Sequence, residues 1–243
     1  FLNRVKMKLY KLLESWYTVN CRCIVMQDER RQALSRKHGI YHEETYLIPN
    51  SYYTQFGNTS DSINNDDISV LYTGSLEEWS ISGIIEQLSR ISGVSITVSG
   101  WSRDRYIERV KTQVKNTSHI NLLEKKLDLK EYRQLVMNHH IGLVWYSSEV
   151  ENVRVIGRSS GKFYMFLSCG KPAIVQNLPG IADDVRNYNL GIVIDDLNGL
   201  PRAVKEIKEK YHYYCENVKQ VYPEVFDYKV AAKTFFDYLH YLR

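Results

Sequence analysis

The residues best suited to chemistry lie in one stretch, residues 157–176. Ser159, Ser160 and Gly161 are small and stand where a helix is expected to begin, and Lys162 follows them. The first turn of a helix has backbone N–H groups without intrahelical acceptors and carries the positive end of the helix dipole. Such a helix start favours an anion, for example a phosphate, and Lys162 would add a full positive charge. The same residues could instead only cap the helix, with Lys162 as a solvated surface lysine.

A turn and a strand follow this helix. The segment Cys169-Gly170-Lys171-Pro172 ends it, because Gly is favoured just past a helix and Pro cannot continue one. Residues 173–175 are apolar and read as a buried strand. Open α/β folds bind nucleotides where helix starts meet the carboxyl ends of parallel strands. The stretch therefore predicts an anion or nucleotide site on such a fold.

The elements that must position this stretch alternate regularly from Ile68 onward. Short, mostly apolar strands are typical of a parallel sheet covered on both faces. They are expected at residues 69–73, 95–99, 120–122, 141–145, 173–175 and 191–194. Helical patterns are expected over roughly 79–91, 103–115, 128–138, 160–168, 180–187 and 198–219, with a last helix over 225–242. The fold class is therefore α/β, with a doubly wound parallel sheet.

The N-terminal part has a different pattern. Residues 2–17 have an amphipathic helical pattern with Lys and Arg between the apolar positions, which suits packing on a domain surface or contact with an anionic membrane face. A strand over 21–27, a helix over 28–38 capped by Asp28, and a short strand over 46–48 follow. Residues 54–67 are polar without a hydrophobic period, so they are expected to be a linker. We therefore expect an N-terminal part at 1–53, a nucleotide-binding Rossmann-like domain at 68–224, and a C-terminal helix at 225–243 that packs back toward the N-terminal part.

Composition excludes several classes of protein. The net charge of +4 is small and spread along the chain, so it gives no case for dedicated nucleic-acid binding. Cys21 and Cys23 have no second pair of metal ligands after them, and Cys169 and Cys215 stand alone, so reduced thiols and no metal site are expected. Reduced thiols and the lack of a signal peptide or an apolar run of membrane-spanning length favour a cytoplasmic protein.

Two nucleotide-binding motifs are also excluded. A dinucleotide-binding Rossmann motif needs G-x-G-x-x-G after the first strand, where this chain has only Gly74. A P-loop needs four residues between Gly and Gly-Lys, followed by Ser or Thr. The segment from Gly157 to Phe163 has a shorter spacing and Phe163 in place of the hydroxyl residue.

An ordered set of short segments nevertheless resembles a known family. They are Ile48-Pro49-Asn50, Tyr72-Thr73-Gly74-Ser75, Thr97-Val98-Ser99-Gly100, residues 141–146, Ser159-Ser160-Gly161-Lys162, Cys169-Gly170-Lys171-Pro172, Pro179-Gly180-Ile181 and Asn189-Leu190-Gly191-Ile192. Together they resemble the donor-binding, C-terminal half of GT-B glycosyltransferases. They are most similar to the retaining bacterial enzymes that build capsule, lipopolysaccharide and exopolysaccharide. The resemblance covers roughly residues 20–240.

The resemblance implies a function and an architecture. A sugar would move from a nucleoside diphosphate sugar to a hydroxyl of a saccharide or lipid-linked acceptor, with retention, and with neither a metal nor a cofactor other than the donor. In that family two Rossmann-like domains face each other across a cleft, and residues 1–50 look like only the end of the first. The chain is therefore expected to be a fragment or one half of a split enzyme, and the inner face of the membrane is one expected location.

The resemblance also implies roles for particular residues, although none is identified as catalytic. The amides of Ser160 and Gly161, with Lys162, would bind the diphosphate, which Gly74 and Ser75 would also face. Gly100 and Trp101 would wall the base pocket, main chain from Lys125 to Leu127 would meet the base, and Arg154 and Arg158 would reach the diphosphate or sugar. The alternatives are a turn at Gly74, packing at Trp101 and solvated arginines; His139 and His140 are expected to be structural.

The chain departs from the family pattern at several positions. Gly157 and Met165 stand where many members have a pair of Glu residues that contact the donor sugar and ribose. Ser75 stands for an expected Arg, and Ser82 lies near an expected Lys. Either other residues bind the donor, or activity is weakened or lost. The leading hypothesis is thus a glycosyltransferase; the alternatives are a non-catalytic GT-B-like module that scaffolds or regulates a transferase, and a sugar-nucleotide epimerase of the same fold.

Overall fold

The structure, a computed structural model, describes residues 2–57, 68–77, 81, 83–102, 106–146 and 151–242. Its centre is a parallel sheet of six strands in the order β5-β4-β3-β6-β7-β8. The strands are β3 (Ser69–Ser75), β4 (Ser95–Trp101), β5 (Ile120–Glu124), β6 (Ile141–Val144), β7 (Ala173–Gln176) and β8 (Gly191–Ile194). The chain winds outward from β3 in one direction and then returns to β6 on its other side. This order confirms the predicted doubly wound α/β fold.

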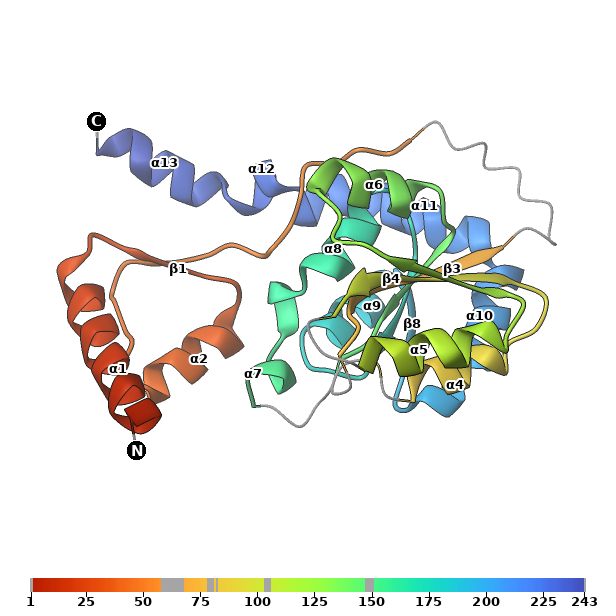
Figure 1. The fold of residues 1–243 in the computed structure, drawn as a ribbon. Helices are drawn as coiled ribbons and strands as arrows, with labels where there is room; N and C mark the ends of the chain where they lie inside the picture. The colour runs from red at the N-terminus through yellow and green to blue at the C-terminus, as the bar shows by residue number, and fades with distance from the viewer. Residues whose placement is uncertain are drawn as a thin grey trace.

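Helices cover both faces of the sheet (Figure 1). One face carries α4 (Ile84–Ser89), α5 (Tyr106–Lys115) and α10 (Leu200–Glu209), and the other carries α6 (Leu129–Met137), α8 (Gly161–Ser168) and α9 (Ile181–Tyr188). The buried residues of α11 (Tyr211–Val221) divide between the two core clusters. Strand alternation divides the core between them: Val70 and Tyr72 of β3 point to the first face and Leu71 to the second. All three side chains are fully buried, which explains why this part of β3 has consecutive apolar residues.

The N-terminal part contains α1 (Leu2–Asn20), β1 (Ile24–Met26), α2 (Glu29–Lys37) and β2 (Thr45–Leu47), with β1 and β2 paired in parallel. The helix α13 (Lys233–Tyr241) lies beside it (Figure 1), and the ring of Tyr46 packs 5.4 Å from that of Phe235 and 5.2 Å from that of Tyr238. The domain bounds given above stay a prediction.

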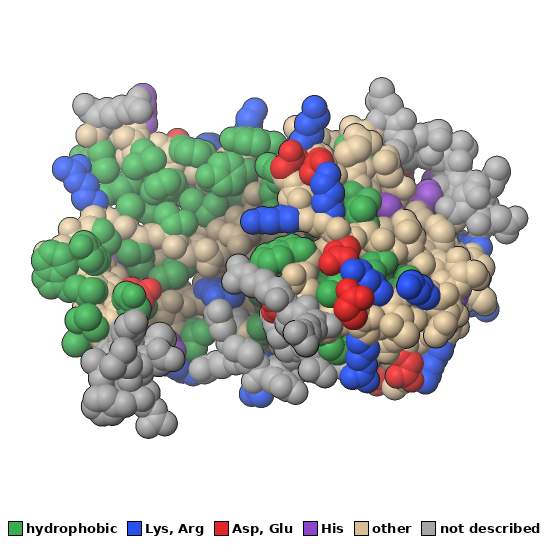
Figure 2. Space-filling model, in the orientation of Figure 1, with side chains coloured by type: hydrophobic (Ala, Val, Ile, Leu, Met, Phe, Trp, Pro, Cys, Tyr) green, Lys and Arg blue, Asp and Glu red, His purple; other side chains and the backbone are tan. Residues whose placement is uncertain are grey.

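Apolar side chains gather on the surface of this N-terminal part and of α13 (Figure 2). The exposed ones include Leu9, Leu12, Leu13, Trp16, Val19, Phe236, Leu239 and Leu242. Contiguous apolar surface of this kind marks a contact site. No helix among the described residues is both long enough and apolar enough to cross a membrane.

Several elements differ from the sequence-based expectation. The helix expected over 198–219 is two helices, α10 and α11, which break at Lys210. The last expected helix is α12 (Tyr228–Ala231) followed by α13, and a π-helical turn, Tyr222–Phe226, precedes them. Pro223 lies in that turn and has no N–H to donate, which is one physical reason for the irregular winding.

Two loops are also more ordered than expected. The segment between the expected strand at 141–145 and the expected helix at 160–168 contains α7 (Glu151–Arg154) and a 3₁₀ turn, η1 (Gly157–Ser159). Thr54, in the expected linker, donates two hydrogen bonds to Asp227 Oδ2, from its amide at 2.7 Å and its hydroxyl at 2.6 Å. The rest of that linker from residue 58, together with residues 78–80, 82, 103–105 and 147–150, lies outside the described residues.

The cysteines differ from expectation in position. The strand β1 begins at Ile24, so Cys21 and Cys23 precede it rather than alternating along it. None of the four cysteines forms a disulfide, and the described residues contain no group of three or more His, Cys, Asp or Glu arranged to hold a metal ion.

Candidate functional site

A cavity of about 410 Å³ lies beyond the carboxyl ends of β3, β4 and β5. This is next to the point where the sheet reverses its winding, the usual ligand site of a doubly wound fold. Its lining comprises Tyr52, Thr73, Gly74, Ser99, Gly100, Trp101, Lys125, Lys126, Leu127, Tyr132, Tyr146, Gly161 and Lys162. Three of these residues are lysines and none is acidic, so the cavity suits an anionic ligand.

The structure brings together seven of the eleven residues expected to bind the donor. These are Gly74, Gly100, Trp101, Lys125, Leu127, Gly161 and Lys162. Four others, Ser75, Arg158, Ser159 and Ser160, do not line the cavity, and Ser82 lies outside the described residues. Sequence reasoning missed Tyr52, Thr73, Ser99, Tyr132 and Tyr146. Thr73 and Ser99 are the last residues of two expected strands, and this position could have identified them as lining residues.

Glycine allows the ends of β3 and β4 to meet below the cavity. A Cβ atom on Gly100 would lie 1.9 Å from the carbonyl oxygen of Gly74, so no other residue fits there without displacing a strand. A Cβ atom on Gly74 would lie 3.5 Å from Lys162 Nζ and 3.2 Å from the hydroxyl of Tyr72. The floor of the cavity is therefore backbone, with the lysine ammonium directly beside it.

The Lys162 ammonium is fixed within the site by contacts with neighbouring residues. Its Nζ donates a hydrogen bond to the carbonyl oxygen of Trp145 at 3.0 Å and lies 4.0 Å from the ring centroid of Tyr146 and 5.1 Å from that of Tyr72. No carboxylate among the described residues lies within ion-pair distance of it. Because burial disfavours the ammonium without an anion to compensate, the pKa of Lys162 falls to about 7.

The start of α8 provides amide donors beside this ammonium. Gly161 and Lys162 are the first two residues of α8, so their N–H groups have no intrahelical acceptor. The amide of Ser160 instead donates to the carbonyl of Gly157 at 3.3 Å. The Ser160 hydroxyl caps the helix by accepting from the Phe163 amide and bonds the Tyr146 hydroxyl at 2.7 Å. Ser160 is thus a buried cap, and the amides available to a ligand are those of Gly161 and Lys162.

The Arg158 side chain is directed elsewhere. Its Nε and one terminal nitrogen donate to the two carboxylate oxygens of Asp184, at 3.2 and 3.0 Å, and its guanidinium lies 5.8 Å from the Phe226 ring centroid. This ion pair raises the pKa of Arg158 further above its already high value. Arg158 therefore ties the loop before α8 to α9 and is not available to the cavity.

Tyrosines and Trp101 form the walls. Burial raises the pKa of both Tyr132 and Tyr146, so they remain neutral phenols that can donate a hydrogen bond. The Tyr132 hydroxyl bonds that of Thr73 at 3.0 Å. Trp101 is 37% exposed, and Lys126 Nζ lies 5.6 Å from its ring centroid. An exposed indole at the rim is a surface on which a planar base can stack.

The loop after β5 is fixed by its own contacts. The Lys125 amide donates to the carbonyl of Gly100 at 2.9 Å, and its Nζ pairs with Glu131. This pair holds the pKa of Glu131 below its usual range. Main chain from Lys125 to Leu127 is therefore held at the rim opposite α8.

The positions that differ from the family pattern have structural explanations. Gly157 has φ of +39°, and a Cβ atom there would lie 2.1 Å from Asp28 Oδ2. Met165 is fully buried in the core cluster that covers the second face of the sheet. Neither position can carry a Glu that faces the cavity in this arrangement.

The two histidines are structural. The ring of His139 bridges the carbonyl of Leu135 at 2.7 Å and the hydroxyl of Thr97 at 2.8 Å, and burial lowers its pKa. His140 Nδ1 accepts a hydrogen bond from the Ser69 amide at 3.1 Å. Neither side chain lines the cavity.

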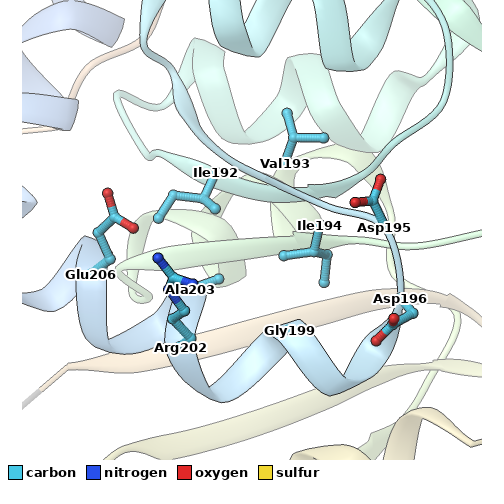
Figure 3. A pocket seen from close by; sticks show the side chains of 9 residues that line it. All are labelled: Ile192, Val193, Ile194, Asp195, Asp196, Gly199, Arg202, Ala203 and Glu206. Carbon is cyan, nitrogen blue, oxygen red and sulfur yellow. The ribbon is translucent and has the colours of Figure 1, made fainter.

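A second cavity, of about 350 Å³, lies between β8 and α10 (Figure 3). Figure 3 shows the carboxylates of Asp195 and Asp196 beyond the end of β8, with Arg202 and Glu206 on α10. With three carboxylates and one guanidinium, this lining repels a diphosphate. None of the residues expected to bind the donor lies there.

Comparisons with known proteins identify the family to which part of the chain belongs. Residues 70–235 match the family model described as the glucosyltransferase 3-like, C-terminal domain. A comparison with curated proteins finds no match.

Several solved structures have the same fold. WaaG, a glycosyltransferase involved in lipopolysaccharide biosynthesis, has a TM-score of 0.63 at 16% identity, over 86% of this chain and 60% of that one. HepE from Anabaena, in complex with UDP and glucose, has a TM-score of 0.66 at 15% identity, over 89% and 62%. Sucrose-phosphate synthase from Thermosynechococcus elongatus has a TM-score of 0.68 at 16% identity, over 97% and 62%. The chain spans about three fifths of the length of these proteins.

Proposed function

The chain belongs to the glucosyltransferase 3-like, C-terminal domain family, and from this premise we propose that its cavity at the ends of β3, β4 and β5 binds the nucleoside diphosphate sugar of a glycosyl transfer. The fold is that of GT-B glycosyltransferases, as the resemblance in the sequence implied. One observation carries the proposal: the Lys162 ammonium lies inside the cavity with no carboxylate beside it among the described residues.

The diphosphate would lie between the start of α8 and the floor at Gly74. There the amides of Gly161 and Lys162 and the Lys162 ammonium provide donors and charge from one side. Gly74 lets the backbone approach from the other. The base would lie between Trp101 and the main chain of Lys125 to Leu127. A cavity of about 410 Å³ is within the range usual for small-molecule sites.

These groups suit the costly step of the reaction. As the bond from the anomeric carbon to the diphosphate breaks, negative charge grows on the departing oxygens. Donors and cations fixed in place before the reaction stabilise that charge. The Lys162 ammonium and the α8 amides would therefore promote departure without a divalent metal. We propose transfer with retention to a hydroxyl of a saccharide or lipid-linked acceptor.

The setting that we propose for the reaction is the membrane surface. WaaG acts in lipopolysaccharide biosynthesis, which supports a role in cell-surface polysaccharide synthesis at the inner face of the membrane. The exposed apolar residues of α1 would suit contact with that face. Groups that bind the acceptor are proposed to lie outside residues 68–224.

Calorimetric titration tests donor binding directly. The protein is titrated with UDP, GDP, ADP and their sugar conjugates, each in EDTA and again with Mn²⁺. We expect one nucleoside family to bind at one site in EDTA, and Mn²⁺ to change the affinity little. Binding only with Mn²⁺ contradicts metal independence, and binding of none of the nucleotides, even by a longer protein that contains the acceptor half, contradicts the function.

A second candidate function is a non-catalytic module that scaffolds or regulates a transferase. The buried Gly157 and Met165 favour it, because neither can provide the carboxylates that many GT-B enzymes use. Such a module would fail to bind nucleotides in the same titration while still binding a partner transferase.

A further inference from the structure

The loop that leads into α8 is held by residues far away in the sequence. The amide of Arg158 donates to Asp28 Oδ2 at 2.7 Å, across 130 residues. Asn50 adds two bonds: its own amide donates to the Arg158 carbonyl at 2.9 Å, and its side-chain amide donates to the Ser159 carbonyl at 2.8 Å. The N-terminal part therefore holds the backbone on both sides of Arg158.

Asp28 serves two elements with one carboxylate. Its Oδ1 caps α2 by accepting from the Arg31 amide at 2.8 Å, while Oδ2 accepts from Arg158. The residue is only 3% exposed, so both oxygens are shielded from water. A buried carboxylate that accepts two amide hydrogens is strongly held, because losing either bond leaves charge without a partner.

Gly157 makes room for this contact. A Cβ atom at that position would lie 2.1 Å from Asp28 Oδ2, well inside contact distance. The positive φ of Gly157 turns the chain so that the next amide points at the carboxylate. Asp28 and Gly157 are therefore a matched pair: the carboxylate fills the space that a side chain at 157 would need.

The loop ends at the donor groups. Ser160 follows Ser159 directly and caps α8, and Gly161 and Lys162 are the first two residues of that helix. Any shift of the backbone at Arg158 is passed over a few bonds to the α8 amides and the base of the Lys162 side chain. Neither Asp28 nor Asn50 lines the cavity, so they act only through this loop.

We propose that Asp28 is a positioning residue for the donor diphosphate: by holding the Arg158 amide it fixes the start of α8, and with it the Gly161 and Lys162 donors. The inference rests on the proposed function, since it assigns the N-terminal part a role in donor binding. The donor site is then not contained in the Rossmann-like half alone. Its geometry depends on residues 28–50 as well.

The variant Asp28→Asn tests the hydrogen bond between the Arg158 amide and Asp28 Oδ2 separately from the helix cap. Asn caps a helix as well as Asp does, so the bond to the Arg31 amide can be kept. Its second atom is an amide nitrogen, which cannot accept from Arg158. We expect the affinity for the bound UDP or GDP sugar to fall about tenfold, with little change in melting temperature, and hydrogen exchange in residues 157–162 to accelerate.

Asp196→Asn is the matched control. Asp196 also caps a helical turn, by accepting from the Asn198 amide at 2.7 Å, but it lies at the second cavity. Nucleotide affinity and exchange in residues 157–162 should stay as in the wild type. Asn50→Ala is the second variant, needed if Asp28→Asn does not fold, and it should weaken donor affinity about threefold through the lost Ser159 contact.

The outcomes separate the two proposals. If the wild type binds no nucleotide, the proposed function fails and this inference falls with it. If the wild type binds and Asp28→Asn binds equally well with unchanged exchange in the loop, only the positioning role is overturned. If Asp28→Asn does not fold, unchanged donor affinity in a folded Asn50→Ala variant likewise overturns only the positioning role. The positioning role is also overturned if donor affinity falls only together with a large loss of stability, because the loss of a purely structural contact would have that same effect.

Discussion

The two cavities described above are close in size but opposite in charge. One has a volume of about 410 Å³ and is lined by Lys125, Lys126 and Lys162 with no acidic residue, and the other has about 350 Å³ and three carboxylates beside Arg202. Both lie near the carboxyl end of a parallel strand, where this fold class binds ligands. The volume of a cavity and its place in the fold therefore do not indicate which of the two binds the donor. The charge of the lining differs between them, and it favours an anionic ligand in the first cavity.

Lys162→Ala should have the largest effect on this comparison. It removes an ammonium that a diphosphate would pair with, and a hydrogen bond to a charged group is worth about 1.5–3 kcal/mol, roughly a tenfold to hundredfold loss of affinity. Calorimetry with the preferred sugar nucleotide measures this loss, and circular dichroism checks that the fold is intact. Wild-type affinity in a folded variant would remove Lys162 from the site.

Trp101→Ala should have a smaller effect. The exposed indole offers a stacking surface for the base, and such stacking is worth about 1–2 kcal/mol, roughly a fivefold to thirtyfold loss of nucleotide affinity. The free nucleoside diphosphate and its sugar conjugate should lose affinity equally, because both carry the base. A loss confined to the sugar conjugate would place Trp101 beside the sugar instead.

The effect of pH on donor binding should be smaller than the effect of Trp101→Ala. Without a ligand the pKa of Lys162 is about 7, and an adjacent diphosphate raises it by stabilising the ammonium. Binding therefore takes up a proton above neutral pH, and affinity falls as pH rises, by about fivefold from pH 7 to pH 8. Titration of the sugar nucleotide over this range measures the slope. A Lys162→Met variant should be independent of pH, and an equal slope in that variant would assign the proton to another group.

Arg202→Ala should have the smallest effect. Arg202 is the cation of the second cavity and so the counterpart of Lys162. If the donor binds only in the first cavity, its affinity should stay within about twofold of the wild type, which is less than 0.5 kcal/mol. A tenfold loss of affinity would instead indicate that the donor binds in the cavity between β8 and α10.

The sequence predicted the sheet well because its strands are buried on both faces. The apolar runs around Val70, Ile96 and Ile174 fall inside β3, β4 and β7, and strand order follows from the winding rule for such folds. The break at Lys210 was not predictable, because neither a Gly nor a Pro marks it. The π-helical turn at Tyr222–Phe226 depends on packing against Tyr52, which a local pattern cannot reveal.

The site was predictable where it depends on strand ends and not where it depends on distant contacts. Gly74, Gly100 and Trp101 follow directly from the positions of β3 and β4. The ion pair that turns Arg158 away needs Asp184, and the cap that occupies Ser160 needs Tyr146. These partners lie 26 and 14 residues away, and only the folded chain brings them close.

The crowding at Gly157 also limits how this sequence can change. An acidic side chain introduced there alone would collide with the Asp28 carboxylate, and the two negative charges would repel in a space that excludes water. Replacing Asp28 with a smaller residue would remove the collision and the repulsion, but the positive φ at position 157 would still strain an acidic residue there. The two positions are thus energetically coupled, and the backbone at position 157 limits the change independently of position 28.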